Sequence, residues 1–216
     1  MNYSENVTYR SLKDKVVAIT GGASGIGEEL VRAYVAQGAR VAFLDFNQAE
    51  GEKLATELGC LFLFCDVTNI PQLKACFETI ADRLGDVDIL INNAGSDDHH
   101  TIDNLTEEYF NNRINVNLRH HLFAIQAVIP GMEKKGAGSI INMGSINWMR
   151  GRPAASAIRC RRRPFTALPA RWRRSWGRAA FALTAWCPAR SKRPSRKPCG
   201  PSSIRRRLIS LWSFRR

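Results

Sequence analysis

The chain has 216 residues, of which 44% are hydrophobic; this suits one α/β domain with a packed core and argues against wholesale disorder. Its net charge of +13 suggests a nucleic-acid binder, but the charge is unevenly distributed. Residues 1–156 carry 14 lysines and arginines against all 19 acids, a balance of −5, whereas residues 157–216 carry 18 cations and no acid. The chain therefore divides into a domain at 1–156 and an arginine-rich tail at 157–216.

No run of 18 apolar residues is present, so the sequence predicts no transmembrane helix and no membrane partner. The first residues, MNYSENVTYRSLKDK, are polar and lack the apolar core of a signal peptide. The six cysteines have no CxxC spacing, which is typical of free thiols in a reducing compartment. We therefore expect a cytoplasmic protein.

Apolar runs alternate with helical patterns along the first part of the chain. In chain order, we expect a strand at 15–20, a helix at 25–37, a strand at 40–45, a helix at 48–58, a strand at 61–65, a helix at 71–84, a strand at 87–91, a long helix at 107–128 and a strand at 139–143. Continuously apolar strands separated by helices indicate a parallel sheet covered on both faces. The sequence thus predicts a doubly wound, Rossmann-like α/β sheet of about five strands. Its ligand should lie beyond the carboxyl ends of the strands, where the strand order reverses.

The turn after the first strand is rich in glycine and reads Thr20-Gly21-Gly22-Ala23-Ser24-Gly25-Ile26-Gly27. Glycine allows a tight turn and lets the backbone approach a pyrophosphate with no Cβ in the way. The next helix then points its first amides at the phosphates. This strand–turn–helix context predicts a dinucleotide site. Its candidate cofactor-binding residues are Gly21, Ser24, Gly25, Ile26 and Gly27.

Asp45 ends the second expected strand, 18 residues after Gly27. A carboxylate at this place accepts hydrogen bonds from the ribose hydroxyls and repels a 2′-phosphate, so we expect NAD rather than NADP. Arg40 begins the same strand and lies too far back to bind that phosphate. The alternative role for Asp45 is the N-cap of the following helix.

Together with these residues, four further motifs resemble those of the short-chain dehydrogenase/reductase family. They are Asp66-Val67 after the third strand, Asn92-Asn93-Ala94-Gly95 after the fourth, Asn117 on the long helix, and Ser145 after the fifth. The resemblance implies two sets of site residues. Those expected to contact the adenine and line the cofactor path are Asp66, Val67, Asn93, Ala94 and Gly95. Those expected at the reacting centre are Asn117, which would hold a proton-relay water, and Ser145, which would orient the substrate hydroxyl.

Several segments narrow the resemblance to bacterial NAD-dependent D-xylose and other aldose 1-dehydrogenases. They are 11–13, 92–100, 113–120 and 142–148. This implies an oxidoreductase that transfers hydride from the C1 hydroxyl of an aldose to NAD, with a small-molecule substrate. Members of the family are usually homo-oligomers built on long helices, one of which is lost here.

The cluster Asp97-Asp98-His99-His100 follows the fourth strand. Its position suits hydrogen bonds to a polyol near the nicotinamide, and a solvated loop is the equal alternative. Consecutive side chains diverge and no partner ligand is evident, so a metal site is disfavoured. Trp148 would either stack on a pyranose or cover the core. The candidate substrate residues are Asp97, His99 and Trp148.

The family chemistry requires Tyr-xxx-Lys, with the tyrosine as base and the lysine lowering its pKa. The expected positions hold Ile158 and Arg162, and no tyrosine follows Tyr109. A one-nucleotide deletion near codon 157 explains this, because the shifted frame permits Y-[ST]-[VLM]-S-K-A at 157–163 and G-I-R-V-N-G-V-V-P-G shortly before 189. We therefore expect an out-of-frame tail and an inactive chain; a remnant that binds the cofactor without catalysis is one alternative. A nucleic-acid-binding tail, with clustered arginine and interspersed tryptophan, is the other alternative.

Overall fold

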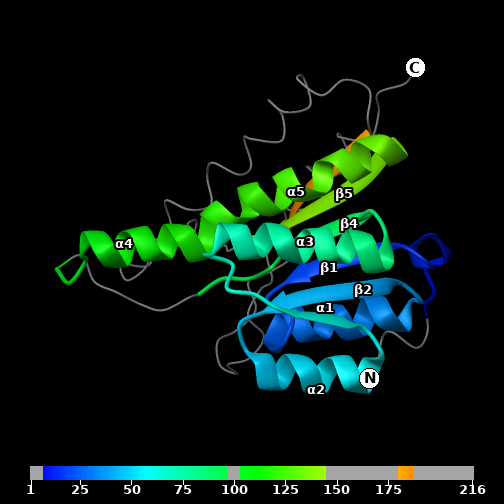
Figure 1. Cartoon of the computed structure of the whole chain (residues 1–216), viewed down its shortest axis with the longest axis horizontal. Coiled ribbons are helices and arrows are strands. Elements are labelled where there is room, and N and C mark those ends of the chain that lie inside the picture. Colours follow the sequence, from blue (N-terminus) through cyan, green and yellow to red (C-terminus); the bar gives the residue numbers. More distant parts are fainter. Residues whose placement is uncertain (1–6, 97–102, 145–179, 187–216) are drawn as a thin grey trace, which may run out of the picture.

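The structure, a computed structural model, describes residues 7–96 and 103–144 and the backbone of 180–186. In this part of the chain, parallel strands form one sheet in the order β3-β2-β1-β4-β5-β6 (Figure 1). The strands are β1 (Val16–Thr20), β2 (Arg40–Asp45), β3 (Leu61–Phe64), β4 (Ile89–Asn92), β5 (Ala137–Met143) and β6 (Ala180–Trp186). The helices are η2 (Arg10–Leu12), α1 (Gly25–Ala36), α2 (Gln48–Leu58), α3 (Ile70–Leu84), α4 (Glu107–Ile114), the π-helical turn η3 (Asn115–Arg119) and α5 (His120–Lys135).

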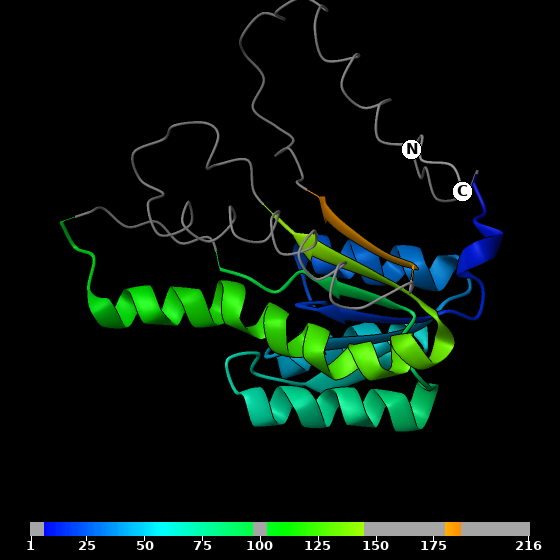
Figure 2. The same cartoon turned by 90° about the horizontal axis from the view of Figure 1, so that it is seen from above.

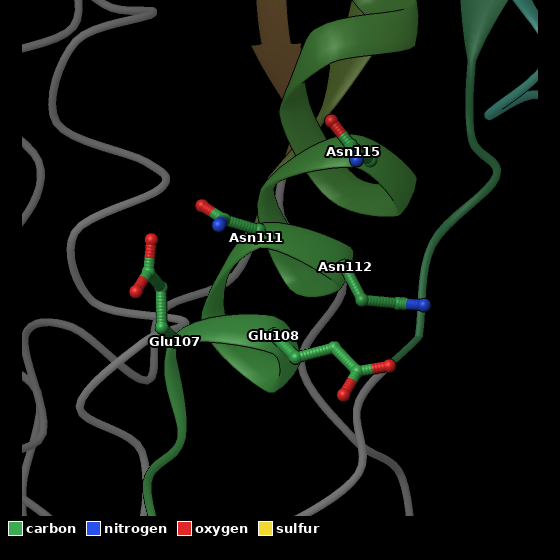
Figure 3. A pocket seen from close by; sticks show the side chains of 5 residues that line it. All are labelled: Glu107, Glu108, Asn111, Asn112 and Asn115. Atoms are coloured by element: carbon green, nitrogen blue, oxygen red, sulfur yellow. The ribbon is translucent and has the colours of Figure 1, made fainter.

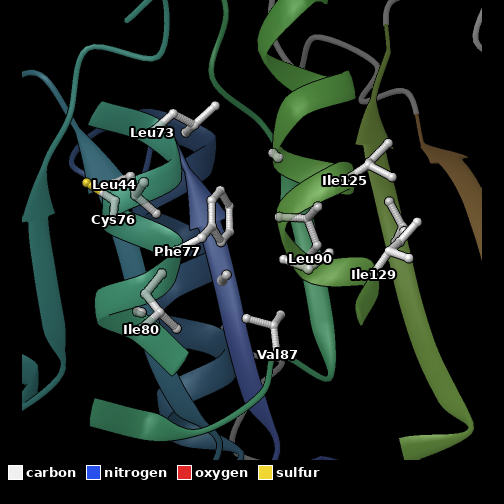
Figure 4. Packing of buried hydrophobic residues seen from close by; sticks show 14 of the residues in the cluster. Leu44, Leu73, Cys76, Phe77, Ile80, Val87, Leu90, Ile125 and Ile129 are labelled. Atoms are coloured by element: carbon white, nitrogen blue, oxygen red, sulfur yellow. The ribbon is translucent and has the colours of Figure 1, made fainter. Parts of the chain in front are cut away.

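Helices cover both faces of the sheet, as Figures 1 and 2 show. One apolar cluster lies under α3 and α5 and contains Leu73, Phe77 and Ile125 (Figure 4). A second lies under α1 and α2 and contains Val31 and Leu54. Every residue of the central strand β1 is fully buried, which explains why its sequence is continuously apolar rather than alternating. The predicted doubly wound α/β fold is confirmed.

The helix boundaries follow local capping chemistry. The Asn47 side chain accepts a hydrogen bond from the Glu50 amide at the start of α2, and Gly59 ends this helix in the left-handed region at φ 65°. Asn69 caps α3 in the same way, and Pro71 occupies its first turn, where no amide hydrogen is needed. Such capping residues can be recognised in the sequence. The expected bounds of these two helices therefore agree with the structure to within one residue.

The long helix differs from the expectation of one element at 107–128. It consists of α4, the π-helical turn η3 and α5, and it continues to Lys135 past Pro130. A proline inside a helix removes one hydrogen bond and leaves the carbonyl four residues earlier without its donor. Here Pro130 and Gln126 are both exposed, so water can serve that carbonyl. No helix in the part of the chain described is long and apolar enough to cross a membrane.

The sheet also contains a sixth strand that the sequence analysis did not predict. β6 pairs in parallel with β5 over seven positions, from Ala137 opposite Ala180 to Met143 opposite Trp186. The sheet therefore has one strand more than the five expected, and this strand, at residues 180–186, comes from the arginine-rich tail. This segment is an uncharged run between charged stretches, and its one polar residue is Thr184. Such a run can pair with the free backbone amides and carbonyls of an edge strand.

Candidate cofactor site

The candidate site lies at the carboxyl ends of β1, β2 and β4. The chain leaves β1 toward β2 on one side and reaches β4 on the other, so the strand order reverses between β1 and β4. In a doubly wound sheet, this reversal leaves a crevice beyond the strand ends in which ligands bind. The glycine-rich turn follows β1, Asp45 ends β2, and Asn92 ends β4. The fold thus brings these three predicted motifs together at the carboxyl ends of the strands.

The glycines of the first turn have distinct steric roles. Gly21 has φ 68°, and a Cβ there would lie 2.7 Å from the Ala94 Cα. A Cβ on Gly27 would lie 1.8 Å from the Gly21 carbonyl oxygen. Gly25 has φ 57° and faces open space instead. The first two glycines therefore let the turn pack against the segment after β4, while Gly25 leaves the outer side of the turn open.

The N-terminus of α1 can hold an anion. Its N-cap residue Ser24 makes no side-chain capping bond, and Ser24 and Ile26 are exposed. The first amides of a helix have no intrahelical acceptor, and the helix dipole adds partial positive charge there. This helix end lies beside Gly25, whose open side is filled by no side chain of the described residues, and it fits the pyrophosphate of a dinucleotide.

Asp45 is 7% exposed and ties β2 to the glycine-rich turn. Its Oδ2 accepts a hydrogen bond from the Ala23 amide at 2.9 Å, and its Oδ1 accepts one from the Asn47 amide at 3.0 Å. The N-cap of α2 is Asn47, so the alternative role of Asp45 as that cap is wrong. Each carboxylate oxygen accepts more than one hydrogen bond, so Asp45 can still bind hydroxyls.

Asp66 and Val67 form the turn between β3 and α3. The Asp66 Oδ1 accepts hydrogen bonds from the Thr68 amide at 2.9 Å and the Thr68 hydroxyl at 2.8 Å. The Asp66 amide donates to the Gln72 Oε1 at 3.0 Å. Asp66 is exposed and Val67 is half-buried against the core. The turn is thus held from within, and the second carboxylate oxygen of Asp66 stays open to a ligand.

The segment Asn93-Ala94-Gly95 after β4 is fastened to β1. The Thr20 hydroxyl accepts hydrogen bonds from the amides of Asn93 and Ala94, both at 3.1 Å. The Asn93 side chain donates to the Gly21 carbonyl at 2.8 Å. The Thr20 side chain and the Gly21 backbone therefore fix the segment against the glycine-rich turn, a role for Thr20 that the motif spacing alone did not reveal.

Asn117 lies in the π-helical turn and is 1% exposed. Its Oδ1 accepts from the Ser96 amide at 2.8 Å, and its Nδ2 donates to the Ser96 carbonyl at 3.1 Å. The amide of Asn117 is thus engaged with the backbone at the end of the β4 segment. π-Helical turns are frequent at functional sites because they displace a side chain from the regular helical ladder.

The structure also shows polar residues that sequence reasoning missed. The Arg113 guanidinium donates to the Ser96 hydroxyl at 2.6 Å. The spacing of Arg113 and Asn117, four residues apart on a helix, is the signal that could have revealed their shared target. Asn92 donates to the Asn142 Oδ1 at 2.8 Å, and the buried Asn92 Oδ1 has no partner among the residues described.

A separate hollow of about 640 Å³ lies along α4 (Figure 3). Its lining comes from that helix and the turn after it and consists of Glu107, Glu108, Asn111, Asn112 and Asn115. None of these residues was predicted to bind a ligand. No residue of the glycine-rich turn, where the cofactor is expected, lines this hollow.

Four of the predicted site residues lie outside the described part of the chain. They are Ser145, Asp97, His99 and Trp148. The neighbouring Asp98 and His100 and the positions of the absent motif, Ile158 and Arg162, lie there too. The structure therefore brings together the residues predicted to bind the cofactor and places Asn117 against Ser96, and the roles expected for all the site residues remain predictions.

The fold and this arrangement of residues are typical of dinucleotide-binding proteins of the doubly wound α/β class. Residues 15–160 match the short chain dehydrogenase family, and the chain belongs to that family. Its members are oxidoreductases that bind a nicotinamide dinucleotide, and the glycine-rich turn and the open α1 N-terminus fit such a group.

Named relatives are dehydrogenases of sugars and other alcohols. The chain is 49% identical over 148 residues to D-xylose 1-dehydrogenase from Caulobacter vibrioides, covering 66% of this chain and 58% of the relative. It is 40% identical over 155 residues to a probable galactose dehydrogenase from Rhizobium meliloti, covering 69% and 60%. It is 38% identical over 143 residues to sorbitol dehydrogenase from Cereibacter sphaeroides, covering 65% and 56%. The chain thus matches about three fifths of the length of these relatives.

Proposed function

We propose that this chain descends from an NAD-dependent aldose 1-dehydrogenase, binds NAD, and as translated does not oxidise sugars. The observation that carries the cofactor proposal is the Asp45 carboxylate. It lies at the end of β2 and is fixed to the glycine-rich turn through the Ala23 amide. A buried carboxylate held there would accept hydrogen bonds from the ribose hydroxyls of NAD and would repel the 2′-phosphate of NADP.

The proposed cofactor residues divide by the part of the dinucleotide they would hold. Asp45, Asp66 and Val67, at the ends of β2 and β3, would take the adenosine. The turn residues Gly21, Ser24, Gly25, Ile26 and Gly27 would take the pyrophosphate at the start of α1. Asn93, Ala94 and Gly95, at the end of β4, would line the nicotinamide half. A bound nicotinamide would supply the acceptor for the hydride of the substrate.

The proposed substrate is an aldose oxidised at C1. D-xylose 1-dehydrogenase and a galactose dehydrogenase are among the relatives, which supports a sugar. Ser145 would orient the reacting hydroxyl, Asn117 would hold a water, and Asp97, His99 and Trp148 would contact the rest of the sugar. Of these residues, only Asn117 lies in the described part of the structure.

The base is the missing part of this constellation. Serine and asparagine cannot take a proton at neutral pH, and the arginines that replace the motif, including Arg162, stay protonated. Loss of a general base costs about 10²–10⁴-fold in rate. We therefore propose that residues 157–216 are translated out of frame, which accounts for the abrupt loss of acids and for the position of Ile158 where a tyrosine is expected.

Equilibrium binding of NADH and NADPH, followed by fluorescence, tests the cofactor proposal on the 216-residue chain. We expect NADH to bind at least about tenfold more tightly than NADPH, since one uncompensated charge contact is worth about 1.4 kcal/mol or more. Asp45→Asn keeps the shape and one acceptor oxygen but removes the charge, so the preference should fall toward one. Glu78→Gln, on the exposed side of α3, removes an equal charge far from the site and should leave the preference unchanged. Tighter binding of NADPH by the unmodified chain would overturn the proposal.

A further inference from the structure

We propose that Arg113 is a positioning residue for the nicotinamide half of the cofactor site and acts through Ser96. The inference rests on the proposed function, because it assumes that a dinucleotide lies across the ends of β2, β1 and β4. None of the motifs in the sequence includes Arg113, which belongs to α4 and contacts the segment that follows β4.

Three hydrogen bonds hold Ser96 to the helix at α4 and η3. Asn117 accepts from its amide at 2.8 Å and donates to its carbonyl at 3.1 Å. Arg113 donates to its hydroxyl at 2.6 Å. Asn117 thus fixes the backbone of Ser96, while Arg113 fixes its side chain. A hydrogen bond from a charged donor is worth about 1.5–3 kcal/mol, about twice a neutral one.

Other contacts hold the Arg113 guanidinium in place. It donates to the Asn112 Oδ1 at 2.8 Å, and its central carbon lies 5.2 Å from the centre of the Tyr109 ring. A planar guanidinium that stacks on a ring and donates in two directions is oriented before any ligand arrives. A lysine ammonium has no such plane and could not keep this arrangement.

The opposite end of the segment is tied to β1. The Thr20 hydroxyl accepts from the amides of Asn93 and Ala94, and the Asn93 side chain donates to the Gly21 carbonyl. Residues 93–96 are therefore hydrogen-bonded to β1 and the turn after it at one end and to α4 and η3 at the other. Without the Arg113 bond, only Asn117 would hold the Ser96 end of the segment, and the bonds at the other end would stay undisturbed.

The position of this segment determines which half of the ligand it affects. Asp45, at the end of β2, lies on one side of β1, and Asn92, at the end of β4, lies on the other. A dinucleotide with its pyrophosphate at the turn after β1 thus places its adenosine toward β2 and its nicotinamide toward β4. Movement of residues 93–96 should therefore weaken contacts with the nicotinamide half and spare the adenosine half.

The test compares two ligands on the full 216-residue chain: NADH, and ADP-ribose, which lacks the nicotinamide ring. In Arg113→Met the Kd for NADH should rise about tenfold, the lower end of what a lost charged hydrogen bond gives, and the Kd for ADP-ribose should stay within about twofold. Ser96→Ala should reproduce this split. The double variant should lose no more than either single variant, because both changes remove the same hydrogen bond. Ser96→Thr, which keeps the hydroxyl, should bind NADH like the unmodified chain.

The outcomes separate this inference from the proposed function. If the unmodified chain binds neither ligand, the proposed cofactor site fails and the inference with it. If it binds both and Arg113→Met changes neither Kd, the inference alone is overturned. Equal losses for NADH and ADP-ribose, together with a lower melting temperature, would show that Arg113 only stabilises the fold, and this too would overturn the positioning role.

Discussion

Gly27→Ala tests the steric argument for the cofactor site, because the new methyl group would meet backbone rather than a flexible side chain. The Cβ would lie 1.8 Å from the Gly21 carbonyl oxygen and 2.7 Å from the Asn93 Nδ2. Nonbonded heavy atoms make favourable contacts at about 3.5 Å or more. The start of α1 must therefore move away from the Gly21 carbonyl by more than about 1 Å. The movement also breaks the 2.8 Å hydrogen bond from Asn93 to Gly21.

The expected loss can be estimated from opposing contributions. Alanine favours a helix over glycine by up to about 1 kcal/mol. Overpacking costs about 1–3 kcal/mol, and the lost hydrogen bond costs about 1 kcal/mol more. The net destabilisation is therefore about 1–3 kcal/mol. Because the displaced atoms include the amides proposed for the pyrophosphate, NADH affinity should fall by about tenfold or more.

Denaturant unfolding and NADH titration measure these two effects separately. Gly59→Ala is the matched control, because Gly59 ends α2 at φ 65° and a Cβ added there would meet no described atom within 4 Å. Backbone strain there should cost about 1 kcal/mol of stability and leave NADH binding unchanged. A Gly27→Ala chain that unfolds at the same denaturant concentration and binds NADH as tightly as the unmodified chain would refute the reasoning.

Three further changes probe contacts that hold the domain together. Burial opposes ionisation of Asp88, but the Val16 amide and Lys135 outweigh it and hold its pKa below the ordinary value. The stability this adds is complete above the unfolded-state pKa of about 3.9 and is lost as pH falls through the lower folded pKa. Asp88→Asn keeps an oxygen for the Val16 amide but loses the charge that Lys135 faces, so it should cost about 1 kcal/mol at pH 7 and make the acid limb of a stability–pH curve less steep; an unchanged limb would contradict this. Thr20→Val should leave two amides without their acceptor and cost about 2 kcal/mol or more in urea unfolding, while Thr20→Ser should not. Asn47→Ala should cost about 1 kcal/mol by removal of the α2 cap, and no loss of thermal stability would count against the capping assignment.

The elements that carry the proposed cofactor residues could be predicted from the sequence because each of their signals is local. A glycine-rich turn between an apolar strand and an amphipathic helix fixes its own geometry, and Asn47 and Asn69 mark the helix starts. Asp45 was located by its distance along the chain from Gly27. Turns and helix caps of this kind can be predicted from the sequence because they depend on neighbouring residues and few distant contacts change them.

Other features depend on contacts between segments far apart in sequence. The Thr20 hydroxyl serves amides more than 70 residues away, and the partners of Arg113 and Asn117 become visible only when α4 lies beside the end of β4. The π-helical turn has no sequence signature comparable to a cap. β6 was missed because the surrounding arginine-rich composition concealed a short uncharged run that pairs with β5.

Restoring the reading frame tests the central claim most directly. One nucleotide inserted at codon 157 should place tyrosine and lysine at the positions of Ile158 and Arg162, while the unmodified chain keeps the same cofactor residues. Both proteins, purified free of host dehydrogenases, are assayed for NADH formation with D-xylose, D-galactose and other aldoses. We predict ordinary enzymatic turnover from the restored protein and none above background from the 216-residue chain, although both bind NADH. Sugar oxidation by the unmodified chain at an ordinary enzymatic rate would contradict both the proposed mechanism and the proposed frameshift.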